Sequence, residues 1–110
     1  MDIKQVASQL GLDEEDIYDV VALFIKTAPS DLMKLISAYN AKNMVQIEEA
    51  AHSLKGSTST LGFSDISKEA QLIMRQSRQN DIESLTTTVP PFLSRMKELF
   101  LELKAVLKNR

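Results

Sequence analysis

Residues 47–62 read Ile-Glu-Glu-Ala-Ala-His-Ser-Leu-Lys-Gly-Ser-Thr-Ser-Thr-Leu-Gly, and their spacing predicts an amphipathic helix. At about 100° per residue, four apolar or small side chains fall within about 40° of Ile47. The only histidine of the chain, His52, falls roughly 140° from Ile47, on the opposite side of the helix. The helix therefore needs other helices to cover one face and leaves the other face to solvent. The stripe expected to be buried consists of Ile47, Ala51, Leu54, Thr58 and Leu61.

The same helical spacing of apolar residues recurs along nearly the whole chain. A short first helix over residues 3–10 is expected to stop at Gly11, and a second begins after an N-cap at Asp13. Pro29 is predicted to break this second helix and to open a third, because the residue before a proline avoids the α region. No segment shows a strand pattern stronger than the helical one. We therefore expect an all-α antiparallel bundle with short connections.

Short polar side chains predict where the later helices begin, because they accept hydrogen bonds from backbone N–H groups of the first turn. The helix that carries His52 is expected to end at Gly62. Pro90 and Pro91 are predicted to kink or split the last helix near residues 86–88, because each removes a backbone donor. The predicted caps are Asn43 with Gln46, then Ser64, and finally Asn80 with Glu83.

The composition excludes several classes of function. The chain has no cysteine, so disulfides, thiolate metal sites and cysteine nucleophiles are excluded. Its 13 basic residues are spread without a cluster, which argues against a nucleic-acid partner. No apolar run approaches the ~18 residues that span a bilayer, and the N-terminus lacks the pattern of a signal peptide. We therefore expect a single cytoplasmic domain, residues 1–110, with neither a nucleic-acid nor a membrane partner.

The polar face of the His52 helix carries a combination that suits phosphoryl chemistry. A lone histidine on such a face is usually a solvated surface residue. Gly56 argues for a functional role of this face. Glycine inside a helix costs about 1 kcal/mol relative to alanine, and this glycine lies opposite the core stripe. An exposed imidazole is largely neutral at cytoplasmic pH and can accept a phosphoryl group. Lys55 is placed to contact the phosphoryl oxygens, and Glu48 could hold the other ring nitrogen.

Residues 51–62, AHSLKGSTSTLG, resemble the signature of histidine-containing phosphotransfer (HPt) domains. The shared features are a histidine followed by Leu-Lys-Gly-Ser and a run of small residues that ends in Leu-Gly. The resemblance also covers the preceding hairpin, residues 23–41, and the two helices that follow. It implies an antiparallel up-down-up-down four-helix bundle with one or two additional short N-terminal helices. One departure is Thr60, where many members carry asparagine, and this position lies away from His52.

The resemblance also implies a role for each residue of the motif. His52 is the phosphorylated residue, normally at its Nε2 atom, Lys55 supports the phosphoryl oxygens, and Gly56 leaves room for the active site of a partner. Ser53, Ser57 and Ser59 are candidates for secondary contacts only. The family accepts a phosphoryl group from a receiver-domain aspartate, as in a hybrid sensor kinase, and passes it to a response-regulator aspartate, or the reverse. Such a carrier is not an autonomous enzyme. Its Mg²⁺ sits in the partner receiver, so no cofactor or metal is expected in this chain.

Two other functions stay open at this point. The chain could be a non-phosphorylated helical-bundle binding module that modulates a kinase or a scaffold through its surface. Metal binding is a weaker hypothesis, because one histidine without cysteine offers few ligands. A monomer is expected, as is common for HPt domains, although helical bundles also dimerise. Val45 and Phe63 are candidates for an apolar docking patch beside His52.

Overall fold

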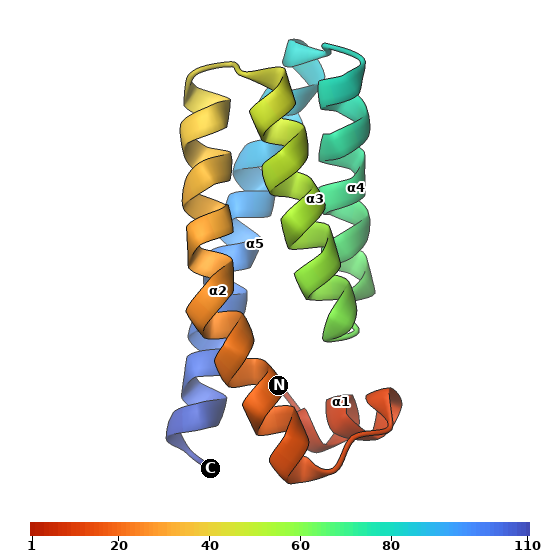
Figure 1. Ribbon diagram of the computed structural model, residues 1–110, viewed down its shortest axis with the longest axis vertical. Coiled ribbons are helices and arrows are strands. Elements are labelled where there is room, and N and C mark those ends of the chain that lie inside the picture. The colour runs from red at the N-terminus through yellow and green to blue at the C-terminus, as the bar shows by residue number, and fades with distance from the viewer.

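The computed structural model describes residues 1–110 and contains five α-helices and no strand. Four long helices run alternately up and down as an antiparallel bundle, and a short N-terminal helix lies across its lower end (Figure 1). The predicted all-α architecture is therefore confirmed, with one additional short N-terminal helix. The helices are α1 (Ile3–Leu10), α2 (Glu14–Asn40), α3 (Met44–Thr60), α4 (Ser64–Arg78) and α5 (Ile82–Lys108).

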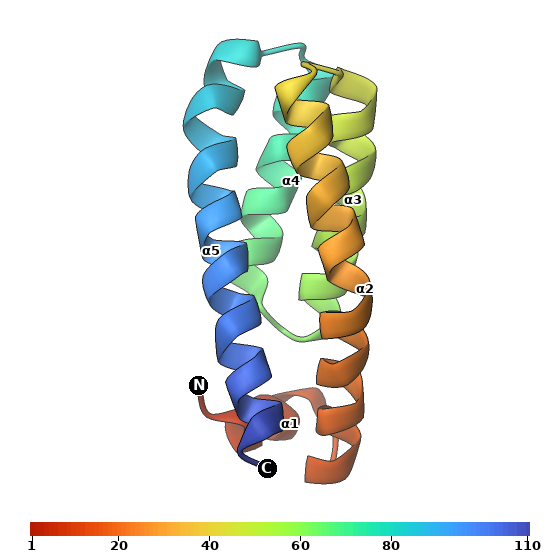
Figure 2. The ribbon, with the colours of Figure 1, turned by 90° about the vertical axis from the view of Figure 1, so that its left-hand side faces the viewer.

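The four bundle helices differ in length, and this difference leaves space for α1 at one end of the bundle. α2 and α5 have 27 residues each, whereas α3 has 17 and α4 has 15. The two long helices therefore extend past the other two at the lower end, where α1 lies beneath α3 and α4 (Figures 1 and 2). Leu10 at the end of α1 approaches the α3–α4 turn, since a Cβ on Gly62 would lie 3.5 Å from Leu10 Cδ2. α1 thus closes the open end of the bundle.

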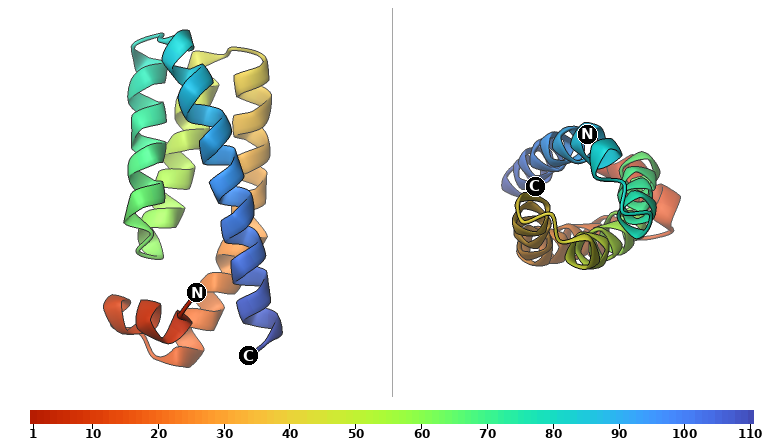
Figure 3. Two further views of the ribbon diagram at one scale, coloured as in Figure 1. Left: turned by 180° about the vertical axis from the view of Figure 1, so that it is seen from behind. Right: turned by 90° about the horizontal axis from the view of Figure 1, so that it is seen from above.

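One hydrophobic core runs between the helices, which surround a common axis when viewed from above (Figure 3). It contains 24 buried apolar residues, including Ile3 and Ala7 of α1. Phe24 of α2 and Phe100 of α5 pack with their ring centroids 5.4 Å apart, so an aromatic pair joins the two long helices. The predicted stripe of α3 is part of this core, because all five of its residues are at most 1% exposed.

Four of the predicted helix boundaries are confirmed. Asp13 and Asn43 each cap a helix by accepting a hydrogen bond from the backbone N–H three residues on, at 2.8 and 3.1 Å. Gly11 ends α1 with a φ of 70°, a left-handed conformation that glycine adopts without steric cost. Gly62 follows α3 with a φ of 77° for the same reason.

Two predicted caps are wrong by one residue. Ser64 is the first residue of α4 and not its cap, because the carbonyl of Phe63 already accepts a hydrogen bond from the Ser67 N–H at 3.0 Å. The Asn80–Glu83 capping box is wrong because Asp81 caps α5, and Asn80 takes a left-handed φ of 53° in the turn before it. Asparagine and aspartate suit both positions, so the pattern alone does not choose between them.

None of the three prolines interrupts a helix, so the predicted break at Pro29 and the predicted split at Pro90 and Pro91 are both wrong. All three prolines are exposed, so the missing backbone N–H groups and the steric contacts of the proline rings lie on the outer side of the bundle. A proline inside a helix costs about 3 kcal/mol, but each apolar side chain buried nearby returns about 1.5–3 kcal/mol. Burial on the inner side therefore outweighs the local cost. The buried neighbours are Ala28 and Leu32 in α2, and Val89 and Phe92 in α5.

The cap of α5 predicts a dependence of stability on pH. The hydroxyl of Ser84 donates to Asp81 at 2.6 Å and its backbone N–H at 3.1 Å, and both hydrogen bonds lower the pKa of Asp81 from its ordinary value of 3.8. A carboxyl group whose pKa is lower in the folded state stabilises the fold above the unfolded pKa and loses that effect as the pH falls through the folded one. Asp81→Asn keeps a capping oxygen but does not titrate. In urea denaturation, the stability advantage of the wild type over Asp81→Asn should shrink as the pH drops below about 4. A pH-independent difference would contradict this assignment.

Candidate functional site

His52 lies in the middle of α3 and is exposed, whereas its neighbours Ala51 and Leu54 are completely buried. The predicted outward orientation of the histidine is therefore confirmed. The reason is the position of the apolar stripe, which turns one side of α3 to the core and leaves the other for polar residues. The imidazole thus sits on a rigid helix and remains open to an approaching molecule.

Two surface hollows between α3 and α4 border His52. One has a volume of about 260 Å³ and the other about 380 Å³. Three residues border both of them, namely His52, Met74 and Arg78. The remaining residues of the first hollow are Lys55, Gln71 and Arg75, and those of the second are Val45, Glu48 and Glu49. The imidazole is therefore surrounded by three cationic and two anionic side chains.

Two interactions connect α4 to α3 on either side of His52. The hydroxyl of buried Ser67 donates to the carbonyl oxygen of Lys55 at 3.3 Å, which ties the two helices together beside the site. Toward the other end of the hairpin, Arg78 Nε donates to Glu48 Oε1 in an ion pair. Within α3, the buried hydroxyl of Thr58 donates to the Leu54 carbonyl at 2.8 Å, so its hydrogen-bonding capacity is satisfied.

The structure brings some of the predicted site residues together and separates others. Lys55 is half-buried and borders the same hollow as His52. Glu48 lies one turn before His52, but its carboxylate is hydrogen-bonded to Arg78 of α4 rather than to the imidazole. Ser53 faces α2, and Ser59 is exposed near the end of α3 and borders neither hollow. Lys55 and Glu48 therefore each share a hollow with His52, together with residues of α4.

The two residues predicted to form an apolar docking patch lie apart. Val45 is 66% exposed and borders the second hollow beside His52. Phe63 lies in the α3–α4 turn, is half-buried against the core and borders neither hollow. Of these two residues, only Val45 therefore lies next to the histidine, where Met74 of α4 also borders both hollows.

Gly56 has no structural need to be glycine within this chain. A Cβ built at this position would meet no heavy atom within 4 Å, which excludes a close helix–helix contact as its reason. Its φ is not among the positive values of the chain, so the backbone conformation suits any residue. Gly56 therefore leaves an open patch of helix surface one turn after His52.

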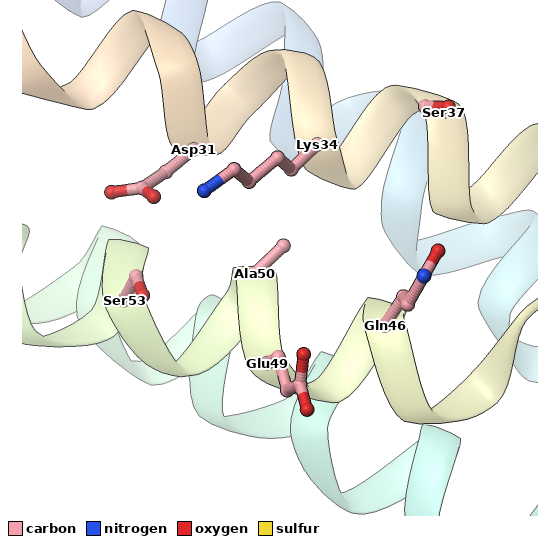
Figure 4. Close-up of a pocket in the computed structure, with 7 residues that line it drawn as sticks. All are labelled: Asp31, Lys34, Ser37, Gln46, Glu49, Ala50 and Ser53. Atoms are coloured by element: carbon pink, nitrogen blue, oxygen red, sulfur yellow. The ribbon is translucent and has the colours of Figure 1, made fainter.

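A polar groove of about 430 Å³ flanks the His52 face on its other side, between α2 and α3 (Figure 4). Asp31 and Lys34 project from α2 into the space that faces α3, where Ala50 and Ser53 lie (Figure 4). The surface beside the histidine thus carries both signs of charge. The lining residues are Asp31, Lys34, Ser37, Gln46, Glu49, Ala50 and Ser53.

Sequence reasoning missed the contribution of α4, which adds Gln71, Arg75 and Arg78 to the surroundings of His52. A signal for these residues was present in the predicted hairpin. Because α3 and α4 are antiparallel and joined by a short turn at Gly62, each residue lies opposite one about equally far beyond the turn. This pairing places the segment from Gln71 to Arg75 beside His52.

The structure holds no group of three or more His, Cys, Asp or Glu side chains that could bind a metal ion. None of its helices combines the length and the apolar character needed to cross a membrane.

Comparisons with known proteins agree with this geometry. A family model described as "Hpt domain" matches residues 19–108. The crystal structure of histidine-containing phosphotransfer protein B (HptB) from Pseudomonas aeruginosa PAO1 superposes with a TM-score of 0.73 at 20% sequence identity, and covers 99% of this chain and 91% of that chain. At this identity the likeness shows a shared fold. No curated relative gives a significant match.

The family match spans α3, α4, α5 and most of α2, and so contains the whole surroundings of His52. It bears out the resemblance that residues 51–62 carry. The all-helical bundle and the solved structure of similar fold agree with it. The chain therefore belongs to the Hpt domain family, phosphocarriers that interact with receiver domains and histidine kinases, and its role is histidine phosphotransfer in phosphorelay signalling.

Proposed function

We propose that His52 is the residue that carries the phosphoryl group in this Hpt domain. The observation that supports the proposal most directly is its position. His52 is the only histidine of the chain, it is exposed on α3, and it borders a hollow together with Lys55, Arg75 and Arg78. No other side chain of the molecule combines a nucleophilic ring nitrogen with such a cationic setting.

The transfer needs no proton donor or acceptor at the attacking nitrogen. In this proposal the lone pair of the neutral ring nitrogen, Nε2, attacks the phosphorus of an aspartyl phosphate. The N–P bond forms while the bond from phosphorus to the carboxylate oxygen breaks, and the aspartate leaves with the electron pair. Return of the group to a second aspartate reverses these two bond changes. The reaction depends chiefly on alignment and on compensation of charge.

Lys55 is proposed to contact the phosphoryl oxygens. Its side chain borders the hollow that also borders His52, and a charge-assisted hydrogen bond from an ammonium group suits a dianionic acceptor. Arg75 borders the same hollow and adds positive charge from α4. Ser53 and Ser59 lie outside this hollow, which limits them to contacts with a docked partner.

The proposed partners are the receiver domain of a hybrid sensor kinase on one side and a response-regulator receiver on the other. A receiver has to bring its aspartate within bonding distance of His52, and the open surface over Gly56 gives it room to do so. We propose that the Mg²⁺ of the reaction is held by the receiver and that the chain acts without a cofactor and without autonomous catalysis. The polar groove between α2 and α3 adjoins the same face and offers Asp31 and Lys34 for pairing with charges of the partner.

Replacing the proposed acceptor tests this assignment directly. His52→Gln should abolish labelling by a phosphorylated receiver domain, because no other histidine is present to accept the group. The receiver is chosen by profiling a panel of receiver domains, and transfer is followed by radiolabel on gels and by intact mass. Glu69→Gln, a change in α4 that borders neither hollow beside His52, should keep the labelling and serves as the matched control. Unchanged labelling of His52→Gln would refute the proposal.

Gly56→Ala separates the demands of the fold from those of the partner. The variant should be more stable by up to about 1 kcal/mol, because alanine is the better helix former and its methyl group meets nothing. Transfer from the receiver should slow by at least about fivefold, since overpacking a tight contact costs about 1–3 kcal/mol.

Phosphorylation of Gly56→Ala by phosphoramidate, a small donor, should proceed at the wild-type rate. In that reaction the P–N bond of phosphoramidate breaks and ammonia leaves. Unfolding by urea and stopped-flow transfer assays measure the two effects. An equal rate of transfer from the receiver in Gly56→Ala and in the wild type would show that the glycine gives the partner no clearance.

A further inference from the structure

The three cations around His52 are not equivalent. Lys55 and Arg75 take part in no ion pair, whereas Arg78 is paired with Glu48. Arg78 and His52 border the same two hollows, and Glu48 borders one of them. The ion pair therefore lies directly beside the position that a phosphoryl group on His52 would occupy.

The arginine of this pair is the partner that is free to move. Its side chain is 59% exposed, compared with 32% for Glu48, and it belongs to the last residue of α4. Glu48 is held within α3, one turn before the histidine. A rotation of the Arg78 side chain changes its partner without moving either helix.

A phosphoryl group on His52 changes the competition for this arginine. It carries about two negative charges near neutral pH and offers three acceptor oxygens, whereas Glu48 offers one charge and two oxygens. An exposed carboxylate–arginine pair is weak, since it changes an equilibrium by roughly one- to fivefold, and it is screened by salt. Because Arg78 borders the same two hollows as His52, the stronger anion there attracts the arginine away from Glu48.

We propose that Arg78 exchanges partners, pairing with Glu48 while His52 is unmodified and with the phosphoryl group once His52 carries it. The inference rests on the proposed phosphorylation of His52 and adds a tuning role for Glu48. Forming the phosphorylated state breaks the Glu48–Arg78 pair and leaves a carboxylate beside a dianion. Both effects reduce the stability that the phosphoryl group would gain from three free cations. Glu48 and Arg78 act here as positioning and tuning residues, not as catalytic ones.

A double-mutant cycle distinguishes an exchange of partners from simple charge effects. The wild type, Glu48→Gln, Arg78→Gln and the double variant are each prepared unmodified and after loading with phosphoramidate. Urea denaturation then gives the factor by which phosphorylation changes the unfolding equilibrium constant of each protein. The unfolded chain contributes nearly equally in all four, so differences in this factor report the folded site.

Exchange predicts that the two substitutions do not act independently. Glu48→Gln should make phosphorylation more favourable to the fold by about two- to fivefold, and Arg78→Gln should make it less favourable. In the Arg78→Gln background, the gain from Glu48→Gln should be clearly smaller, because no ion pair is left to break. The NMR signal of the Arg78 Nε–H should also shift on loading.

The chain offers a matched control in its other ion pair. Arg95 Nη1 of α5 donates to Glu69 Oε1 of α4 at 2.6 Å, and neither residue borders the hollows beside His52. Glu69→Gln and Arg95→Gln should leave the effect of phosphorylation unchanged, and the Arg95 signal should not shift. Equal effects of Glu48→Gln in both backgrounds, with His52 fully loaded, would overturn the exchange alone. Failure of His52 to accept the group at all would instead contradict the proposed function.

Discussion

The close packing of α3 against α4 is the constraint on which the rest of the structure depends. It requires small or apolar side chains on the inner side of α3, and Ala51, Leu54 and Thr58 meet that requirement with complete burial. Because 3.6 residues make one turn, burying these positions leaves the side of His52 facing solvent. The hydrogen bond from Ser67 to the Lys55 carbonyl then fixes how far along α3 the second helix lies. The outward orientation of His52, the proposed nucleophile, and its cationic surroundings thus follow from a single packing interface.

Much of this arrangement could be predicted from sequence, because it follows from periodicity and from local hydrogen bonding. The buried stripe of α3 and the caps at Asp13 and Asn43 depend only on residues a few positions apart. The errors at Pro29 and at Pro90 and Pro91 have a different origin. There the local preference for a break competes with burial against other helices, which the local pattern does not contain. The partners of His52 on α4 were missed for a related reason, since they depend on how two helices pair across a turn.

Gly56 shows how an apparent defect in a helix can be interpreted. Within the chain, glycine at this position costs stability and relieves no contact, so neither the fold nor the backbone conformation accounts for it. A cost without an internal benefit suggests a benefit outside the molecule. The glycine lies one turn from the proposed phosphoryl acceptor, where another protein has to approach closely. Membership of the Hpt family supplies such a partner, a receiver domain.

A carrier has to release its cargo as readily as it accepts it, and this requirement bears on the charges around His52. A site with three unopposed cations would favour the phosphorylated state strongly and so slow the onward transfer. Here Glu48 and Glu49 lie beside the same histidine, Arg78 is already engaged, and the site is open to water, which weakens each interaction. In our proposal the free energy of the phosphoryl group on His52 therefore stays moderate. In the same proposal a docked receiver excludes water and brings its own charges, so that the partner, and not this chain, decides the direction of transfer.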